Sequence, residues 1–146
     1  MNIFVLDDCP FRHHKFTAGL IGASLQRAFT ADDAYPILRH TEFDVVFLDH
    51  DLEMSGERCG NGMEVVNAIG FLLNTGVYPS ARAIHCVHSL NPGAAKTMYD
   101  TLKALGLETK RCTSAWTEED HMADLVAGDW TFPERWSDAL EWETRA

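Results

Sequence analysis

Residues 43–51, FDVVFLDHD, decide the fold of this chain. The apolar part of this stretch, Phe43 to Leu48, is nearly continuous, which is typical of a strand covered on both faces in a parallel sheet. It ends abruptly in Asp49-His50-Asp51. In open α/β sheets, ligands bind beyond the carboxyl ends of the strands. The stretch therefore predicts both a buried strand and a candidate site at its end.

The same pattern of an apolar run followed by polar groups occurs twice more. Ile3 to Leu6 ends in Asp7-Asp8, and Arg82 to Val87 ends in His88-Ser89. Two weaker strand candidates complete the set, Leu25 to Phe29 and Glu108 to Cys112. Five strands are therefore expected.

Helical patterns separate these strands. Helix starts are marked by Thr30, a good N-cap followed by two aspartates, and by Asn91-Pro92. Pro36 is expected to kink or shorten the helix in which it lies. The helices are expected over Phe11 to Leu20, from Thr30 onward, over Met63 to Leu73, and from Asn91 to the stop at Gly106.

Strict alternation of strands and helices predicts one doubly wound, flavodoxin-like domain with a five-stranded parallel sheet in three α/β/α layers. We assign this domain to residues 1–127. Residues 128–146 form an acidic tail with Trp130, Trp136 and Trp142, and we expect a helix there that packs on the same domain. A substrate lid or a dimer contact is the alternative for this tail, so a homodimer stays open.

Charge and composition exclude several classes of function. The chain has 146 residues and a net charge of −10, so it lacks the basic surface of a protein that binds duplex DNA. It has no apolar run of membrane-spanning length and no signal peptide pattern, so we expect a cytoplasmic protein without a membrane partner. None of the four cysteines has CxxC spacing, and we expect reduced thiols.

The three polar strand ends are expected to meet at one edge of the sheet. Several carboxylates at one place repel each other unless a cation lies among them, and a hard divalent ion, Mg²⁺ or Mn²⁺, meets that need. Helix caps or a solvated loop are the alternative explanation for Asp7 and Asp8. His50 and His88 stand beside the carboxylates and are candidates for proton transfer, although structural histidines are common. One of His13 and His14 is expected to face this edge and the other to face solvent.

The acidic pair after the first strand and Asp49 after the third resemble the acidic residues of response-regulator receiver domains. This resemblance implies that Asp7, Asp8 and Asp49 coordinate Mg²⁺. The sequence departs from ordinary receivers after Asp49, where HDLEMSGERCGNG replaces a methionine-proline turn, and in HSLNPGAAKTM. It also has no proline after Lys110 and Arg111.

The segments that depart from ordinary receiver domains are similar to those of a narrower family of receiver-like proteins. VLDDCPFRHHKF, FLDHDL with a downstream GNGMEV, and VHSLNPGAAKTM resemble the cyclic-phosphate processing receiver-like family over roughly residues 1–112. The resemblance implies processing of cyclic phosphates, at RNA ends above all, in bacteria or phages. The tail lies outside it.

The leading hypothesis is a metal-dependent phosphoester hydrolase that acts on a cyclic phosphate, either an RNA 2′,3′-cyclic phosphate end or a cyclic nucleotide. The partner would be a phosphorylated small molecule or an RNA end. Asp49 as a covalent nucleophile is an open variant of this mechanism. The alternative is a non-catalytic module that is phosphorylated on Asp49, or that binds a phosphorylated ligand or a protein partner. Beside the metal ligands, the hypothesis assigns proton transfer, orientation and substrate contacts to His50, Asp51, His88 and Asn91, and phosphate binding to Ser89, Lys110 and Arg111.

Overall fold

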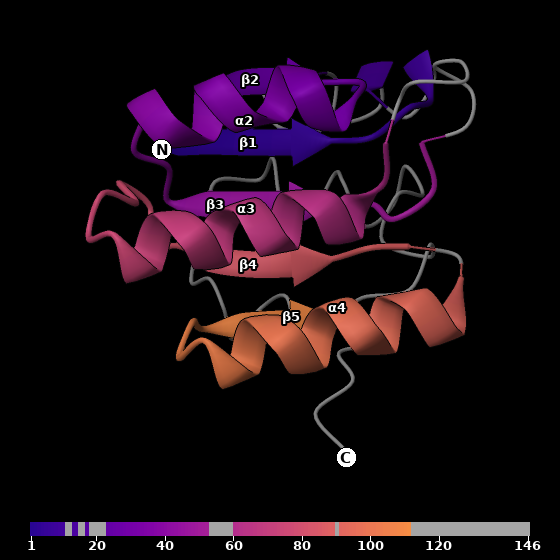
Figure 1. Ribbon diagram of the computed structural model, residues 1–146. Coiled ribbons are helices and arrows are strands. Elements are labelled where there is room, and N and C mark those ends of the chain that lie inside the picture. Colours follow the sequence, from indigo (N-terminus) through magenta and orange to yellow (C-terminus); the bar gives the residue numbers. More distant parts are fainter. Residues whose placement is uncertain (11–12, 15–16, 18–22, 53–59, 90, 112–146) are drawn as a thin grey trace.

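The computed structural model describes residues 1–10, 13–14, 17, 23–52, 60–89 and 91–111. Five parallel strands form one sheet in the order β2-β1-β3-β4-β5 (Figure 1). This order confirms the predicted doubly wound sheet, and it places the change of winding direction between β1 and β3. The strands are β1 (Asn2–Leu6), β2 (Ser24–Ala28), β3 (Val45–Leu48), β4 (Ile84–Val87) and β5 (Thr109–Arg111).

Some strands are shorter than their apolar runs. β3 begins at Val45 rather than at Phe43, whose backbone N–H donates to Ser80 Oγ at 2.8 Å instead of to a neighbouring strand. Phe43 is nevertheless buried. The apolar run correctly predicted which residues are buried, but Phe43 is buried without being part of the hydrogen-bonded strand.

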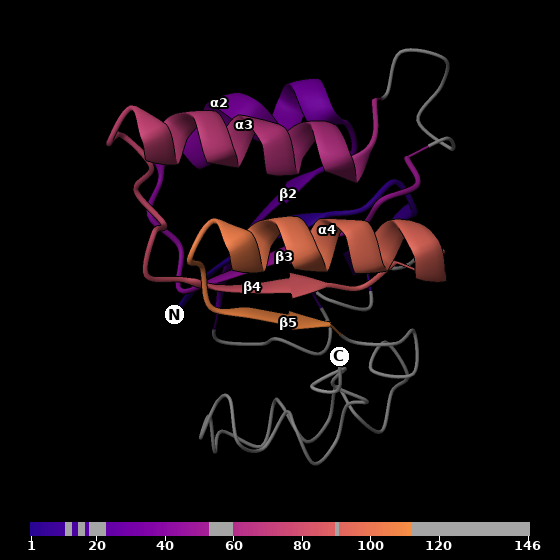
Figure 2. The ribbon, with the colours of Figure 1, turned by 60° about the horizontal axis from the view of Figure 1, so that its bottom comes forward.

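Three helices cover one face of the sheet: α2 (Ala31–His40), α3 (Gly62–Asn74) and α4 (Pro92–Ala104) (Figures 1 and 2). Each begins at a side chain that accepts a backbone N–H. Thr30 caps α2 as predicted, Asn91 caps α4 as predicted, and Asn61 caps α3. These caps satisfy N–H groups that have no partner inside the helix.

Pro36 does not shorten α2, so this part of the expectation was wrong, and a kink stays a prediction. The helix continues through Pro36 to His40, and Thr41 N–H still bonds to the Ile37 carbonyl. Pro36 is exposed, as is Asp32, whose carbonyl loses its helical partner and can be solvated. Ala34 and Leu38 hold the opposite side of the helix in the core.

The core lies between the sheet and these helices, with strand side chains that include Phe4, Leu6, Leu48 and Val87. Buried residues of the opposite sheet face include Val5, Phe47 and Cys86. Near that face, residues 10, 13, 14 and 17 are helical. The rest of the segment predicted as the first helix, and residues 112–146 with the tail, lie outside the described residues. No helix in the described part of the chain is long and apolar enough to cross a membrane.

Candidate metal centre and the adjoining histidine–aspartate pair

The register of the sheet brings three polar residues into one row. Leu6, Leu48 and Val87 form the last paired row of the three central strands, so Asp7, Asp49 and His88 come directly after it. Their backbones continue the ladder: Asp49 N–H donates to the Leu6 carbonyl and His88 N–H to the Leu48 carbonyl, both at 3.0 Å. Because side chains alternate between faces, all three point to the side of the sheet opposite α3 and α4.

Asp7, Asp49 and His88 form a compact buried group. Each offers one ligand atom, and these atoms all lie within 4.8 Å of one another. His88 Nε2 lies 3.0 Å from Asp7 Oδ2, and both side chains are almost completely buried. Two carboxylates so close together in a buried site repel each other, and a divalent cation between them removes that cost. The donor set therefore fits a metal ion.

Asp8 is buried next to the group but is not one of its three members. His88 occupies the third position, which the sequence hypothesis had given to Asp8. The assignment of Asp8 as a metal ligand stays a prediction, and the geometry adds His88 to the set of candidate ligands.

His13 supports the backbone of the same group. Its Nε2 lies 2.6 Å from the Asp7 carbonyl oxygen, and its ring packs on Phe29 with 4.3 Å between centroids. Burial lowers the pKa of His13, and the Asp7 carbonyl and carboxylate oppose this effect. His14 is exposed. This confirms that one histidine of the pair faces the acidic edge while the other faces solvent.

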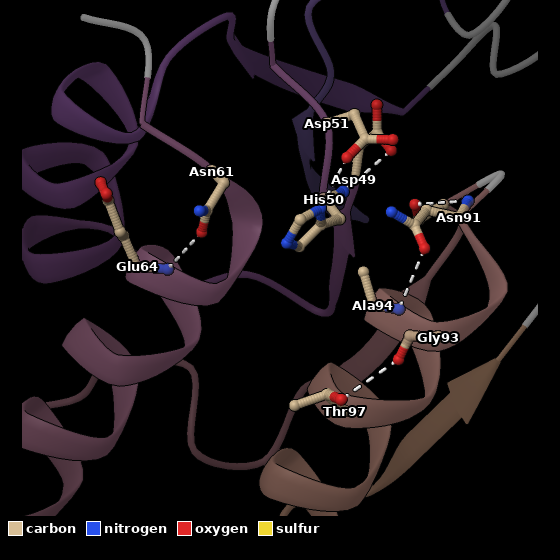
Figure 3. A network of polar contacts seen from close by, with 10 residues as sticks. Asp49, His50, Asp51, Asn61, Glu64, Asn91, Gly93, Ala94 and Thr97 are labelled. Atoms are coloured by element: carbon tan, nitrogen blue, oxygen red, sulfur yellow. Dashed lines mark hydrogen bonds and ion pairs between the residues drawn. The ribbon is translucent and has the colours of Figure 1, made fainter.

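His50 and Asp51 form a second, more accessible pair. His50 Nδ1–H donates to Asp51 Oδ1 at 2.6 Å, because a carboxylate can only accept. The side chains of His50 and Asp51 are 22% and 42% exposed, whereas Asp7, Asp49 and His88 are buried. His50 is tied to the centre through its backbone N–H, which donates to Asp49 Oδ1 at 2.9 Å. In Figure 3 the imidazole of His50 lies on the side where α3 and α4 begin.

The GNG motif holds the start of α3 against this pair. Gly60 has a positive φ of 70°, Asn61 pairs with Asp51 in an isolated bridge, and Gly62 N–H donates to the His50 carbonyl at 2.9 Å. A Cβ at Gly62 would lie 2.1 Å from the Asp49 carbonyl oxygen. Glycine at position 62 is therefore required by close contact with the residue that offers a metal ligand.

Three of the remaining predicted site residues, Ser89, Asn91 and Arg111, contact the segment that starts α4. Ser89 Oγ accepts from Asn91 N–H at 3.1 Å. Asn91 Oδ1 caps the helix by accepting the Ala94 N–H, as drawn in Figure 3. Arg111 donates to the Pro92 carbonyl at 3.1 Å. Lys110 lies in the row of Cys86, one row before the Val87 row. The role of both cations in phosphate binding stays a prediction.

Sequence reasoning did not place His88 among the candidate metal ligands, although a signal for it existed. Once the three apolar runs are aligned by their last apolar residues, Leu6, Leu48 and Val87, the next residues are Asp7, Asp49 and His88. Alternation of side chains then places all three on one face. The buried position of His13 was foreseen only as one of two choices.

Comparison with solved structures places this fold among receiver domains. The chain is similar to a CheY-like response regulator receiver domain protein from Methanospirillum hungatei, with a TM-score of 0.59, 16% identity, and coverage of 86% of this chain and 87% of that chain. It is also similar to a response regulator from Burkholderia pseudomallei that was solved with a phosphorylated aspartic acid, calcium ion and citrate. That comparison gives a TM-score of 0.57 and 17% identity, and it covers 86% of this chain and 71% of that chain. For the receiver domain of Francisella response regulator 1452, the TM-score is 0.55 and the identity 16%, with coverage of 86% of this chain and 93% of that chain.

A family model then gives the narrower assignment. The model for the cyclic-phosphate processing receiver domain matches residues 1–104. The chain therefore belongs to the cyclic-phosphate processing receiver domain family, as the sequence motifs indicated. No curated protein matches the chain.

Proposed function

We propose that this protein is a metal-dependent phosphoester hydrolase that acts on a cyclic phosphate. The observation that carries the proposal is the buried group of Asp7, Asp49 and His88, whose ligand atoms lie within 4.8 Å at the carboxyl edge of the sheet. It lies where the winding direction changes, the position at which open α/β sheets bind their ligands. The family assignment supports a cyclic phosphate as the substrate.

A divalent ion held by this group would offset phosphate charge and lower the pKa of a bound water. The chain's own residues then divide the remaining work. His88 contacts Asp7 in the buried group, whereas His50 is partly exposed. We therefore assign proton transfer to His50. Because His50 Nδ1–H is donated to Asp51, the other ring nitrogen, Nε2, carries the lone pair that accepts a proton.

The reaction balances without a further reactant. The oxygen of water forms a bond to phosphorus while His50 Nε2 takes up the water proton. One of the two ester bonds of the cyclic phosphate breaks, and the leaving oxygen receives a proton from the protonated imidazole. The product is a phosphomonoester, and His50 is returned to its neutral form. Asp51 acts as a positioning residue, because it holds the ring of His50 in one orientation.

The start of α4 is the position that we assign to the phosphate group of the substrate. The first N–H groups of a helix favour phosphate oxygens. In α4, Pro92 has no N–H and the Ala94 N–H donates to Asn91 Oδ1, so we assign phosphate binding to the Gly93 N–H beside Asn91. Asn91 is exposed and so accessible to a ligand. We keep Lys110 and Arg111 as the candidates for a compensating positive charge.

Turnover assays test the proposal directly. Purified protein is mixed with RNA that ends in a 2′,3′-cyclic phosphate, and separately with cyclic nucleotides, each with Mg²⁺ or Mn²⁺. We expect conversion to a phosphomonoester that is lost in Asp7→Asn and Asp49→Asn. Asp100→Asn is the matched control, because Asp100 is an exposed carboxylate that pairs with Lys96 on α4. Absence of turnover for every substrate and both ions would exclude the hydrolase.

A second function has one specific observation in its favour. Asp49 follows β3 within a receiver fold, and the Burkholderia response regulator of the same fold was solved with a phosphorylated aspartic acid. The alternative is thus a signalling module phosphorylated on Asp49. It predicts a stable adduct after incubation with a small phosphodonor and Mg²⁺, detected by intact mass and absent in Asp49→Ala. A phosphorylated protein that turns over no cyclic phosphate would favour this alternative.

A further inference from the structure

We infer that His88 is itself a ligand of the metal ion, through Nε2, and that the centre therefore prefers Mn²⁺ or a later first-row ion to Mg²⁺. This inference rests on the metal centre of the proposed function and specifies its chemistry. It is carried by the position of one nitrogen, His88 Nε2, which lies 3.0 Å from Asp7 Oδ2 in the buried group that also contains Asp49.

The spacing fits two ligands of one ion. Ligands bound at right angles to each other at about 2.1 Å from a metal are about 3 Å apart. His88 Nε2 and Asp7 Oδ2 are 3.0 Å apart, and Asp49 completes a group within 4.8 Å. Little movement is needed for all three atoms to reach a common ion.

The orientation of His88 is fixed by its surroundings. Its side chain is 2% exposed, and its ring meets Phe47 at an interplanar angle of 70° with 6.2 Å between centroids. The nitrogen directed into the group is Nε2. His13 is excluded as a ligand through its own Nε2, because that atom is engaged by the Asp7 carbonyl at 2.6 Å.

The donor set decides the kind of ion. Mg²⁺ prefers oxygen ligands and gives up its waters reluctantly, so an imidazole adds little to its binding. Imidazole suits later first-row ions, and affinity for mixed nitrogen and oxygen sites rises from Mn²⁺ toward Cu²⁺. Two carboxylates balance the charge of such an ion, and the neutral imidazole adds a third bond. A receiver-like site with oxygen ligands alone would lack this discrimination.

Two measurements on the full chain test this inference without an activity assay. Calorimetric titration gives the dissociation constants of Mn²⁺ and Mg²⁺ for the wild type and for His88→Gln. Pulsed electron paramagnetic resonance of the Mn²⁺ complex detects nitrogen bound to the ion. Protein labelled with ¹⁵N-histidine needs no mutation and keeps the measurement valid if His88→Gln fails to fold. His40→Gln is the matched control, because His40 is exposed at the end of α2.

We expect tighter binding of Mn²⁺ than of Mg²⁺ and a ¹⁴N signal that changes to ¹⁵N in the labelled protein and is absent in His88→Gln. The substitution should weaken Mn²⁺ binding about tenfold or more and Mg²⁺ binding much less, whereas His40→Gln should change neither. A bound Mn²⁺ without a nitrogen signal would overturn the inference and leave the proposed metal centre intact. Absence of binding by both ions would remove the metal centre itself.

Discussion

At the scale of single residues, Tyr78 and His85 form a neutral buried pair inside the core. His85 Nδ1–H donates to the Ala83 carbonyl at 3.0 Å, so Nε2 is the acceptor of the Tyr78 hydroxyl at 2.7 Å. Burial raises the pKa of Tyr78 and lowers the pKa of His85 to about 4. The sequence gives no signal for this contact, because Tyr78 lies outside every expected strand and helix. The pair is structural, and it explains one histidine that the chemistry does not use.

The first prediction concerns this pair. Tyr78→Phe removes the hydroxyl and leaves His85 Nε2 buried without its donor, which costs about 1–3 kcal/mol. We expect the free energy of unfolding, measured by urea denaturation at neutral pH, to fall by that amount. Tyr99→Phe is the control, because Tyr99 is only partly buried on α4 and should change stability little. Equal stability losses in the two variants would contradict the assigned hydrogen bond.

The second prediction concerns Asp51, the positioning residue of His50. Asp51→Asn cannot hold the protonated imidazole as the carboxylate does, so kcat should fall about 10-fold to 100-fold while KM changes little. Because Asp51 is 42% exposed, the free energy of unfolding should stay nearly unchanged. Asp51→Glu should recover part of the loss. A kcat equal to that of the wild type in Asp51→Asn would show that His50 needs no such support.

At the scale of elements, the start of α3 packs directly against the backbone of Asp49, a candidate metal ligand. The third prediction is that Gly62→Ala lowers the free energy of unfolding by about 2–4 kcal/mol. Its Cβ would meet the Asp49 carbonyl oxygen at 2.1 Å, and backbone cannot move as easily as a flexible side chain. Displacement of Asp49 should also weaken Mn²⁺ binding, which calorimetry would measure.

A second glycine of the same helix gives the control. At Gly70 a Cβ would meet only Leu105 side-chain atoms at 3.5 Å, an ordinary contact. Gly70→Ala should therefore raise stability by about 0.5–1 kcal/mol through helix propensity, and should leave Mn²⁺ binding unchanged. If Gly62→Ala were as benign as Gly70→Ala, the close approach of α3 to the centre would be wrong.

Local sequence signals predicted most elements because local physics determines them. Thr30 and Asn91 start their helices as expected, since a side-chain acceptor directly before an amphipathic run satisfies backbone donors. The apolar run ending at Leu48 gave a buried strand. Pro36 was misjudged because its cost depends on tertiary context: an exposed helix side lets solvent satisfy the lost carbonyl partner.

The candidate site was predicted less completely because it depends on strand register. The convergence of Asp7 and Asp49 follows from strand order alone, and the structure brings them together. Whether the third member is Asp8 or His88 depends on which residue continues the paired row, and neighbouring strands far apart in sequence decide that. The hydrogen bond between His50 and Asp51 could be expected from adjacency, but its geometry could not.

At the scale of the whole molecule, one edge of the sheet carries two different groups of polar side chains. The buried group of Asp7, Asp49 and His88 lies on the sheet face opposite α3 and α4, whereas the imidazole of His50 lies on the side where those helices begin. Asp49 connects the two, because its Oδ1 accepts the His50 N–H. A phosphate held at this edge would therefore meet a metal from one side and a proton-transferring group from the other.

The stability of the whole molecule should also depend on pH through His85, which is the fourth prediction. Burial lowers the pKa of His85 from 6.5 to about 4 in the folded chain. Between these two values the unfolded chain binds a proton that the folded chain does not, so stability is complete above pH 6.5 and falls as the pH drops toward 4. The loss from this residue should approach about 3 kcal/mol.

Other ionisable groups of the chain also contribute to the pH dependence of stability, so the contribution of His85 is isolated by difference. Urea denaturation of the wild type and of His85→Gln, both with a chelator present, gives the free energy of unfolding at a series of pH values from 7 down to about 4. Glutamine cannot take up the proton, so the variant should lose stability less steeply below pH 6.5, even if it starts from a lower value at neutral pH. Parallel curves for the two proteins would mean that His85 is protonated equally in the folded and unfolded chains. His85 would then take up a proton in the folded core below pH 6.5, although Nε2 accepts the Tyr78 hydroxyl in the structure.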